Sequence, residues 1–261
     1  MPQKSTKDTT TSVRIAAAAD VHCRASSAGT LQPFFERMAQ ESDVILLGGD
    51  LTDRGTPEEA HVLARALTGA RVPILAVLGN HDYESGLESE VSQILADAGV
   101  YMLDGDAVEI CGVGFAGVKG FFGGFGKRTL EPWGESTIKQ IVHETINEAL
   151  KLEAGLARLR TPHRIVLLHY APIRATVEGE PPEIFPFLGS SRLEDPLTRF
   201  DVTAVFHGHA HAGSLEGRAQ GDIPVYNVAM ALLGRHRPDQ PPFRTIELEV
   251  PVESCDPPLV V

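Results

Sequence analysis

Short, continuous apolar runs alternate along this chain with stretches in which apolar residues recur at helical spacing. A continuous apolar run of a few residues is typical of a strand that is buried on both faces of a sheet. The runs that predict such strands are 13–19, 44–47, 74–78, 164–168 and 202–206. Further strand-like segments are 107–118, 223–228 and 244–250. This alternation of strands and helices predicts a layered α/β fold.

Helical spacing predicts four helices, at about residues 31–41, 56–69, 88–98 and 135–160. The second has the clearest beginning. Thr56 is a capping residue, Pro57 takes the first helical position, and Glu59 follows three residues after the cap. Gly69 stands where this helix should end.

The chain has 261 residues, and no linker-like stretch divides its interior. This length suits one large α/β domain, which we expect at residues 12–250. Residues 1–11 and 251–261 have the polar or proline-rich composition of flexible tails. No segment approaches the about 18 to 20 apolar residues that a membrane span requires. We therefore expect no contact with a membrane.

The formal net charge is -12. Long nucleic acid is an unfavourable partner for such a chain, because nonspecific binding depends on Lys and Arg side chains that neutralise phosphates. The three cysteines, Cys23, Cys111 and Cys255, are odd in number and widely spaced. This pattern fits a reducing compartment better than a disulfide framework, so a cytoplasmic location is expected.

Residues of the types that commonly bind metal ions follow each of the five apolar runs. These segments are Asp20-Val21-His22, Gly49-Asp50, Gly79-Asn80-His81-Asp82, His169 and Gly208-His209-Ala210-His211. Asp20 and His22 lie two positions apart, so in extended backbone both side chains point to the same side and reach one cation. Asp50 has two carboxylate oxygens and is suited to bridge two cations. The pattern predicts a two-metal hydrolytic centre along one edge of the sheet.

The predicted donors are carboxylate, amide and imidazole groups, without a required thiolate. This set suits Mn, Fe, Zn, Co or Ni better than an all-oxygen Ca or Mg site, and it does not choose among them. His209 and His211 could serve the same cation or neighbouring ones. Each motif alone also fits an ordinary turn or a solvated side chain. Their occurrence together, each at a strand end, favours the metal centre.

With the ordered motifs D-x-H, G-D-x-x-D, G-N-H-D, a lone His and G-H-x-H, the chain resembles the calcineurin-like metallophosphoesterases over residues 20–211. The resemblance implies an α/β fold, a four-layered α/β/β/α sandwich with two mixed β-sheets. It implies two divalent or trivalent metal ions, with Mn, Fe or Zn as the foremost candidates. The implied ligands are Asp20, His22, Asp50 and His211 for one ion, and Asp50, Asn80, His169 and His209 for the other.

The resemblance also implies a reaction, in which a hydroxide that bridges the ions attacks phosphorus in line. His81 would contact the phosphate and act as general acid or as electrostatic stabiliser of the leaving oxygen. Asp53 would orient the His81 ring, and Asn80 would also contact the substrate. Arg54 has two interpretations, a phosphate contact or a solvated charge near a helix start.

Several activities fit this motif set. We expect a phosphoesterase for a small phosphodiester or nucleotide, and the sequence leaves a homo-oligomer open. Arg54 favours the alternative of a phosphomonoesterase, and a non-catalytic scaffold on the same fold is a third interpretation. Asp82 stands where the Ser/Thr phosphatase branch has Glu, which argues against protein phosphatase activity. A nuclease would normally add a basic surface, which this chain lacks.

Other candidate residues have simpler interpretations. His207 is expected to pack beside the site rather than bind metal, and Cys23 is expected to be a small buried packing residue. Residues 119–134 form a long loop that is either a lid or a packed segment, and packing is favoured. Its notable side chains are Phe121, Phe122, Phe125, Lys127, Arg128 and Trp133. Residues 174–191 suggest a rigid rim beside His169.

Overall fold

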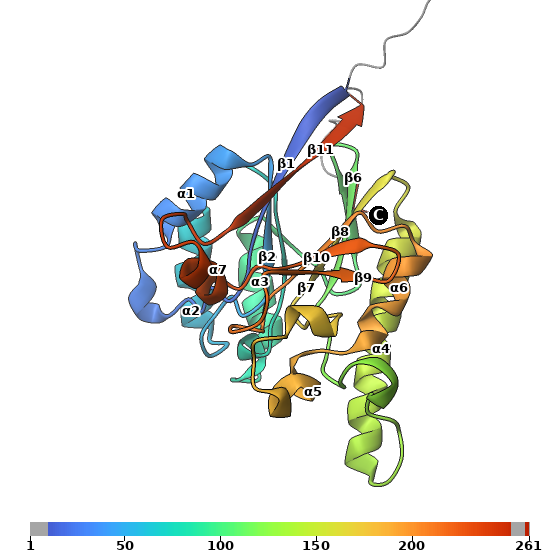
Figure 1. Ribbon diagram of the computed structural model, residues 1–261. Helices are drawn as coiled ribbons and strands as arrows, with labels where there is room; N and C mark the ends of the chain where they lie inside the picture. The colour runs from blue at the N-terminus through green and yellow to red at the C-terminus, as the bar shows by residue number, and fades with distance from the viewer. Residues whose placement is uncertain (1–9, 252–258, 261) are drawn as a thin grey trace, which may run out of the picture.

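The computed structural model describes residues 10–251 and 259–260. Two mixed β-sheets pack face to face, and helices cover the outer face of each (Figure 1). The predicted four-layered α/β/β/α sandwich is therefore confirmed. Most of the expected tails, 1–11 and 251–261, lie outside the described residues. Within the described part, Thr10 and Thr11 belong to the first strand.

The first sheet has the order β11-β1-β2-β3-β4. Its strands are β1 (Thr10–Ala18), β2 (Val44–Gly48), β3 (Ile74–Val77), β4 (Val100–Met102) and β11 (Arg244–Pro251). β1 to β4 run parallel, and β11 pairs antiparallel with β1 along the whole strand. The carboxyl ends of β1, β2 and β3 therefore meet at one edge.

The second sheet has the order β12-β5-β6-β7-β8-β10-β9. Its strands are β5 (Ala107–Ile110), β6 (Val113–Val118), β7 (His163–Leu168), β8 (Ala204–His207), β9 (Glu216–Ala219), β10 (Ile223–Asn227) and β12 (Leu259–Val260). β6, β7, β8 and β10 are parallel. The predicted single strand 107–118 is wrong: it is a hairpin, turning at Cys111 and Gly112, where φ is 48° and 74°.

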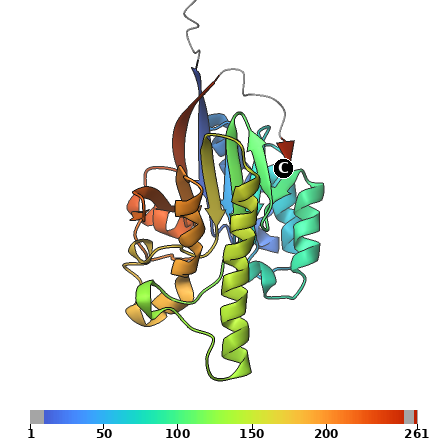
Figure 2. The same cartoon turned by 90° about the vertical axis from the view of Figure 1, so that its right-hand side faces the viewer.

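Helices α1, α2 and α3 cover the first sheet, and α4 and α6 cover the second (Figures 1 and 2). The α-helices are α1 (Gln32–Glu41), α2 (Pro57–Leu67), α3 (Glu88–Asp97), α4 (Ser136–Arg158), α5 (Phe185–Leu188), α6 (Asp195–Arg199) and α7 (Met230–His236). Short 3-10 helices are η1 (Ala25–Ser27), η2 (His81–Tyr83), η3 (Gly126–Arg128), η4 (Arg174–Thr176), η5 (Pro182–Ile184) and η6 (Ser191–Leu193). The four predicted helices are α1 to α4.

The predicted start of α2 is confirmed in detail. The Glu59 amide donates to Thr56 Oγ1 at 3.4 Å, and Glu59 Oε2 accepts from the Thr56 amide at the same distance. This reciprocal cap satisfies amides that have no partner inside the helix. Glu59 Oε2 also accepts from the Arg54 amide at 2.9 Å. The cap thus fixes the segment that leads from β2 into α2.

Alternate side chains of each central strand enter two different cores. In β1 and β2, Ile15 and Leu46 face the second sheet, while Ala16 and Ile45 face α1 and α2. This alternation follows from the two-residue repeat of a strand. Burial on both faces explains why these strands read as continuous apolar runs.

Main-chain hydrogen bonds continue past the strand ends and hold the connecting loops together. The Asp20 amide donates to the Gly49 carbonyl, and the His22 amide donates to the Asp50 carbonyl, both at 2.9 Å. In the second sheet, the Gly208 amide donates to the His169 carbonyl at 3.1 Å. The loops after β1 and β2 thus form one bonded group, and those after β7 and β8 form another. Within the described ranges, no helix is long and apolar enough to cross a membrane.

Candidate metal centre

Four of the predicted metal ligands have left-handed backbone. The φ angles are 60° at Asp20, 46° at His22, 47° at Asp50 and 67° at His209. Non-glycine residues rarely take this conformation, which costs about 1 to 3 kcal/mol each and persists only where the surrounding structure enforces it. This left-handed conformation turns the chain sharply after each strand and directs these side chains toward a common point.

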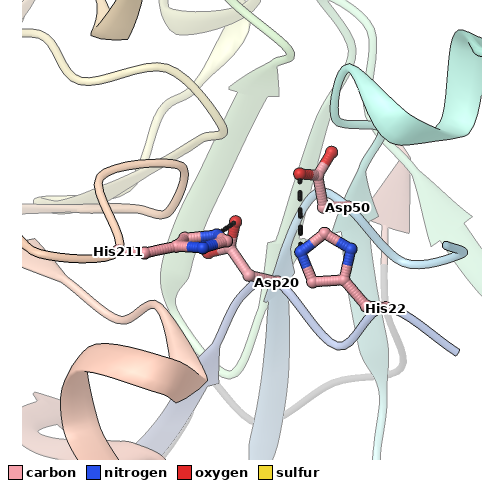
Figure 3. Close-up of side chains that lie close together, drawn as sticks. All are labelled: Asp20, His22, Asp50 and His211. Carbon is pink, nitrogen blue, oxygen red and sulfur yellow. Dashed lines mark hydrogen bonds and ion pairs between the residues drawn. The ribbon is translucent and has the colours of Figure 1, made fainter. Parts of the chain in front are cut away.

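A first group of donors consists of Asp20, His22, Asp50 and His211, with one donor atom from each lying within 4.8 Å of the others (Figure 3). His211 Nε2 lies 3.0 Å from Asp20 Oδ1, and His22 Nε2 lies 3.8 Å from Asp50 Oδ2. The His22 Nδ1 atom is buried and has no hydrogen-bond partner among the described residues. These are the four residues predicted to share one cation.

A second group consists of Asp50, His169 and His209, with the same 4.8 Å limit. Asn80 joins it, because its Oδ1 lies 2.9 Å from His169 Nε2. His209 Nε2 faces the carbonyl oxygen of Phe187 at 3.2 Å, which leaves Nδ1 as the atom that is free to bind. The structure thus brings together all seven residues predicted as ligands, and Asp50 belongs to both groups.

The surroundings of the His169 ring favour a bound cation. Its Nδ1 lies 3.0 Å from the Gly48 carbonyl, so Nδ1 carries the proton that this acceptor requires. In the neutral ring, Nε2 then presents a lone pair, which faces Asn80 Oδ1 at 2.9 Å and Asp50 Oδ1 at 3.4 Å. Three acceptor atoms that converge repel one another unless a positive charge lies between them. An imidazole held by a carbonyl at its other nitrogen is a common arrangement at metal sites.

Burial and neighbouring charges set the protonation states in both donor groups. Burial lowers the pKa of His209 to about 3, with a further contribution from His169, so the ring is neutral at physiological pH. Burial by itself would raise the pKa of Asp20, but the hydrogen bond from His211 and the nearby imidazoles outweigh it and lower the pKa. A neutral imidazole and an ionised carboxylate are the forms that bind metal ions.

His81 lies beside the donors, and its contacts differ from one expectation. Its ring packs edge-on against His22, with centroids 4.6 Å apart, and its amide donates to Asp50 Oδ1 at 2.9 Å. Nδ1 lies 2.8 Å from the main-chain carbonyl of Asp53. Asp53 thus holds this ring through its main-chain carbonyl rather than through its carboxylate, which pairs with Arg24 at 3.0 Å and lies 3.7 Å from His22 Nδ1.

The Asp53 carbonyl still gives His81 a defined orientation, with Nε2 left available. Burial tends to lower the pKa of His81, but the hydrogen bond to Asp53 and the nearby carboxylates of Asp50 and Glu84 outweigh it, and the pKa is raised. Arg54 is exposed. Its amide contacts Glu59, while its side chain makes no hydrogen bond or ion pair within residues 10–251.

Two glycines of the motifs are required because ligands approach them closely. A Cβ at Gly79 would lie 2.2 Å from both the amide nitrogen and Oδ1 of Asp50. A Cβ at Gly208 would lie 2.4 Å from Asp20 Oδ2. Neither contact can be relieved without moving a predicted ligand. Glycine is therefore needed before Asn80 because Gly79 packs against Asp50, and before His209 because Gly208 packs against Asp20.

Asp82 is a structural residue that the sequence did not identify as such. Its fully buried carboxylate accepts from the amides of Leu51, Thr52 and Gly79 at 2.8 to 3.1 Å, and from the Thr52 hydroxyl at 2.5 Å. Burial raises its pKa, with a smaller contribution from Asp50. Asp82 thus ties the loop after β2 to the loop after β3.

We expect Asp82→Asn to destabilise the protein by about 2 to 4 kcal/mol, because the new amide nitrogen would face donors and leave them unsatisfied. Calorimetric unfolding should show a lower melting temperature, and retained metal should decrease in parallel. Asp239→Asn changes an exposed carboxylate and serves as the matched control. Equal melting temperatures for the two variants would contradict the assigned role.

Two predicted packing residues behave as expected. His207 is buried, with Nε2 2.8 Å from Thr176 Oγ1, and burial lowers its pKa to about 4. It belongs to neither donor group. Cys23 is also buried, its Sγ lies 3.7 Å from the Glu59 carbonyl, and burial raises its pKa to about 12. This thiol is held in the unreactive protonated form.

The long loop 119–134 is mainly packed against the domain. Phe121 and Phe122 are partly buried against the core under α4, and Phe125 packs near α5. Trp133, by contrast, is 68% exposed. The favoured packing interpretation therefore applies to the three phenylalanines and not to the tryptophan. The segment 174–191 contributes the Phe187 carbonyl beside His209, as a rim next to the site would.

A family comparison agrees with this geometry. The model of the calcineurin-like phosphoesterase family matches residues 13–213, which include every predicted ligand. The chain belongs to this family. Members of the calcineurin-like phosphoesterase family are phosphoester hydrolases that use divalent metals. The family assignment made from the motifs is thereby confirmed.

Two curated members of the family are similar to this chain. A "Probable cyclic nucleotide phosphodiesterase" of Ruthia magnifica subsp. Calyptogena magnifica is 24% identical over 186 residues, which are 66% of this chain and 63% of that protein. A protein of the same name from Vesicomyosocius okutanii subsp. Calyptogena okutanii is 25% identical over 184 residues. That match covers 65% of this chain and 62% of the relative. The chain thus spans less than two thirds of the length of these relatives.

Solved structures share the fold at low identity. The phosphopantetheinyl hydrolase PptH from Mycobacterium tuberculosis has a TM-score of 0.62 and 15% identity, covering 89% of this chain and 95% of its own. TT1561 of Thermus thermophilus has a TM-score of 0.52 and 16% identity, covering 90% and 99%. These likenesses establish the architecture of this calcineurin-like phosphoesterase.

Proposed function

We propose that this protein is a two-metal phosphodiesterase that hydrolyses a small phosphodiester or nucleotide. The observation that carries the proposal is the position of Asp50, whose two oxygens face different imidazoles, Oδ2 toward His22 and Oδ1 toward His169. A carboxylate in this position suits a bridge between two cations. The names of the curated relatives favour a cyclic nucleotide among small diesters.

Each donor group would hold one metal ion. In this proposal one ion is held by Asp20, His22, Asp50 and His211, and the other by Asp50, Asn80, His169 and His209. The mixed oxygen and nitrogen donors suit Mn, Fe or Zn. When bound, such a pair of cations would acidify a coordinated water and offset negative charge on the phosphoryl oxygens.

The side chains around the donors would complete the reaction. His81 has its Nδ1 fixed by the Asp53 carbonyl, so the protonated ring, which the raised pKa favours, would donate a proton or a hydrogen bond from Nε2 to the leaving oxygen. Arg54 is exposed and its guanidinium is not engaged by any residue in 10–251, so it is available to contact phosphate. That contact would also suit a monoester, which is the second candidate substrate.

We expect metal-dependent turnover of bis(p-nitrophenyl) phosphate. The purified chain, stripped with a chelator, should be inactive, and activity should return with Mn²⁺, Fe²⁺ or Zn²⁺ at about two ions per chain, as a two-metal centre requires. Release of nitrophenolate and metal analysis by mass spectrometry are the measurements. p-Nitrophenyl phosphate, run in parallel, tests the monoester alternative.

Three results of this experiment would count against the proposal. Faster turnover of the monoester would identify a phosphomonoesterase. Activity that survives complete removal of metal would exclude the proposed chemistry. Failure to bind any of the three metals, together with inactivity toward both esters, would leave a non-catalytic scaffold as the better explanation.

A further inference from the structure

Lys119 is a buried cation that the proposed reaction does not use. It follows β6 directly and is only 9% exposed. Its carbonyl oxygen accepts from the amides of His169 and Tyr170, at 3.0 and 3.1 Å. The Tyr170 ring in turn packs against His209, with centroids 4.5 Å apart. Lys119 is therefore bonded to the segment that carries one predicted ligand, His169, and that segment packs against a second, His209.

The Lys119 ammonium is surrounded by aromatic rings. Nζ lies 4.5 Å from the ring centroid of Phe121, 5.3 Å from that of Tyr83 and 5.5 Å from that of Tyr170. Among residues 10–251, its one hydrogen bond is to the Gly120 carbonyl, at 2.9 Å, and it forms no ion pair. An ammonium has three donors, so two remain unused.

A nearby carboxylate that could pair with Lys119 is engaged elsewhere. Glu148 accepts from the Gly120 amide at 2.7 Å and from Lys151 Nζ at 2.9 Å. Burial lowers the pKa of Lys119, which reflects the unfavourable transfer of an ammonium out of water. A buried cation with unused donors is unfavourable for folding by itself, and a bound group that accepts from those donors would offset this cost.

Lys119 lines a pocket of about 370 Å³. Leu78 and Tyr83 also line it, and these two residues flank the 79–82 segment that carries Asn80 and His81. Further lining comes from α3, which contributes Ser92 and Gln93, from Met102 at the end of β4, and from Leu103 in the connection between β4 and β5. The pocket is thus adjacent to the candidate metal centre and has both apolar and hydrogen-bonding surface.

The charges of the pocket limit what it accepts. Glu88, Asp104 and Asp106 line it together with Lys119, so carboxylates outnumber the cation. A second phosphate group would be repelled by these carboxylates. An uncharged group with acceptor atoms could use the free donors of Lys119, and a planar one could also lie against the ring of Tyr83, which is 39% exposed.

We propose that this pocket binds the nucleobase of a substrate, and that Lys119 is the residue that selects it by donating to a carbonyl or ring-nitrogen acceptor. The inference rests on the proposed phosphodiesterase function and deepens it. A pocket that selects an uncharged base with acceptor atoms, next to a single phosphodiester, disfavours nucleoside polyphosphates. In this arrangement the base is bound in the pocket, apart from the chemistry at the metals.

Two chromogenic diesters test the assignment on the metal-loaded protein. p-Nitrophenyl thymidine 5′-phosphate and bis(p-nitrophenyl) phosphate carry the same charge and release the same nitrophenolate, but only the first has a base. Lys119→Met should raise KM for the thymidine ester by about 10- to 100-fold, the range expected for loss of a hydrogen bond from a charged donor. kcat for this ester, and both constants for the aryl diester, should stay unchanged.

A second variant and a control separate this role from a structural one. Ser92→Leu fills the pocket from α3 without removing charge and should raise KM for the thymidine ester selectively as well. Lys139→Met removes an exposed lysine of α4 and should change neither ester. Equal effects of Lys119→Met on the two esters, or no effect on either, would overturn the assignment.

Direct binding distinguishes failure of this inference from failure of the proposed function. Equilibrium dialysis with labelled thymidine should show binding to the wild type and none to Lys119→Met, whether or not either ester is hydrolysed. Inactivity of the wild type toward both esters would refute the phosphodiesterase proposal alone. Equal retention of thymidine by wild type and Lys119→Met would refute the base-binding role of Lys119.

Discussion

Asp50→Asn is expected to lower turnover of bis(p-nitrophenyl) phosphate by about 10³-fold or more, because a bridged metal pair contributes several kcal/mol to catalysis. Asn has nearly the same shape as Asp and also tolerates the left-handed φ of 47° at this position. It loses the negative charge and one of the two oxygens, so it cannot bridge. Metal content should fall from about two ions per chain to one or fewer.

Metal analysis after reconstitution and dialysis, together with steady-state rates, measures this effect. Asp222→Asn is a matched control, because Asp222 also has left-handed backbone, with φ of 63°, but its side chain is 85% exposed. The control should keep both metals and full activity. An Asp50→Asn protein that still holds two ions and turns over normally would show that the bridge lies elsewhere.

The central layers of the fold follow closely from the sequence. The strands that carry the site are buried on both faces, so their apolar runs are continuous and their ends are marked by the first polar residue. The helix at Pro57–Leu67 was predictable for a different reason, since Thr56 and Glu59 form a cap whose residues are specified locally. Both signals come from residues that lie close together in the sequence, so they can be recognised from the sequence alone.

Peripheral elements were not predictable in this way. β4 (Val100–Met102) has three residues, too few for a periodic signal, and β9 (Glu216–Ala219) is a partly exposed edge strand of mainly polar or small residues. The hairpin at Cys111-Gly112 resembles a continuous strand in the sequence, because Cys is an unusual residue at a position of positive φ. These elements are stabilised by pairing with neighbours rather than by local preference.

The candidate site was predictable as a set of residues but not as a set of contacts. Motif order and strand ends were sufficient to select the seven ligand candidates, because parallel strands bring their carboxyl ends together. The sequence could not indicate that His81 is held by the carbonyl of Asp53 rather than by its carboxylate. Nor could it indicate that Asp82 accepts hydrogen bonds from two loops, since three of its four donors are main-chain amides.

Lys119 shows why burial must be known before a cation is interpreted. In the sequence, Lys127 and Arg128 are the evident cations of the 119–134 loop, because they are adjacent and directly follow Gly126. In the structure both are exposed, whereas Lys119 is buried among aromatic rings. Its position directly after a buried strand, as for the metal ligands, was the available signal. A lysine in that position merits the same attention as an aspartate or a histidine.

His81→Gln is expected to separate the two roles that remain open for this residue. If His81 donates a proton to the leaving oxygen, kcat should fall by about 10²- to 10⁴-fold for a cyclic nucleotide, whose alkoxide leaves poorly without protonation. The nitrophenolate of an aryl diester leaves without a proton, so its release should be nearly unaffected. If His81 instead stabilises charge on the phosphoryl oxygens, kcat should fall for both substrates.

The structure allows this variant to be interpreted cleanly. His81 is not among the predicted ligands, and its amide bond to Asp50 comes from the main chain, so metal content should be unchanged. Gln retains a hydrogen-bonding group but cannot act as a proton donor near neutral pH. His143→Gln, at an exposed position of α4, is the matched control. Full activity of His81→Gln toward the cyclic nucleotide would exclude both roles, because each requires the imidazole.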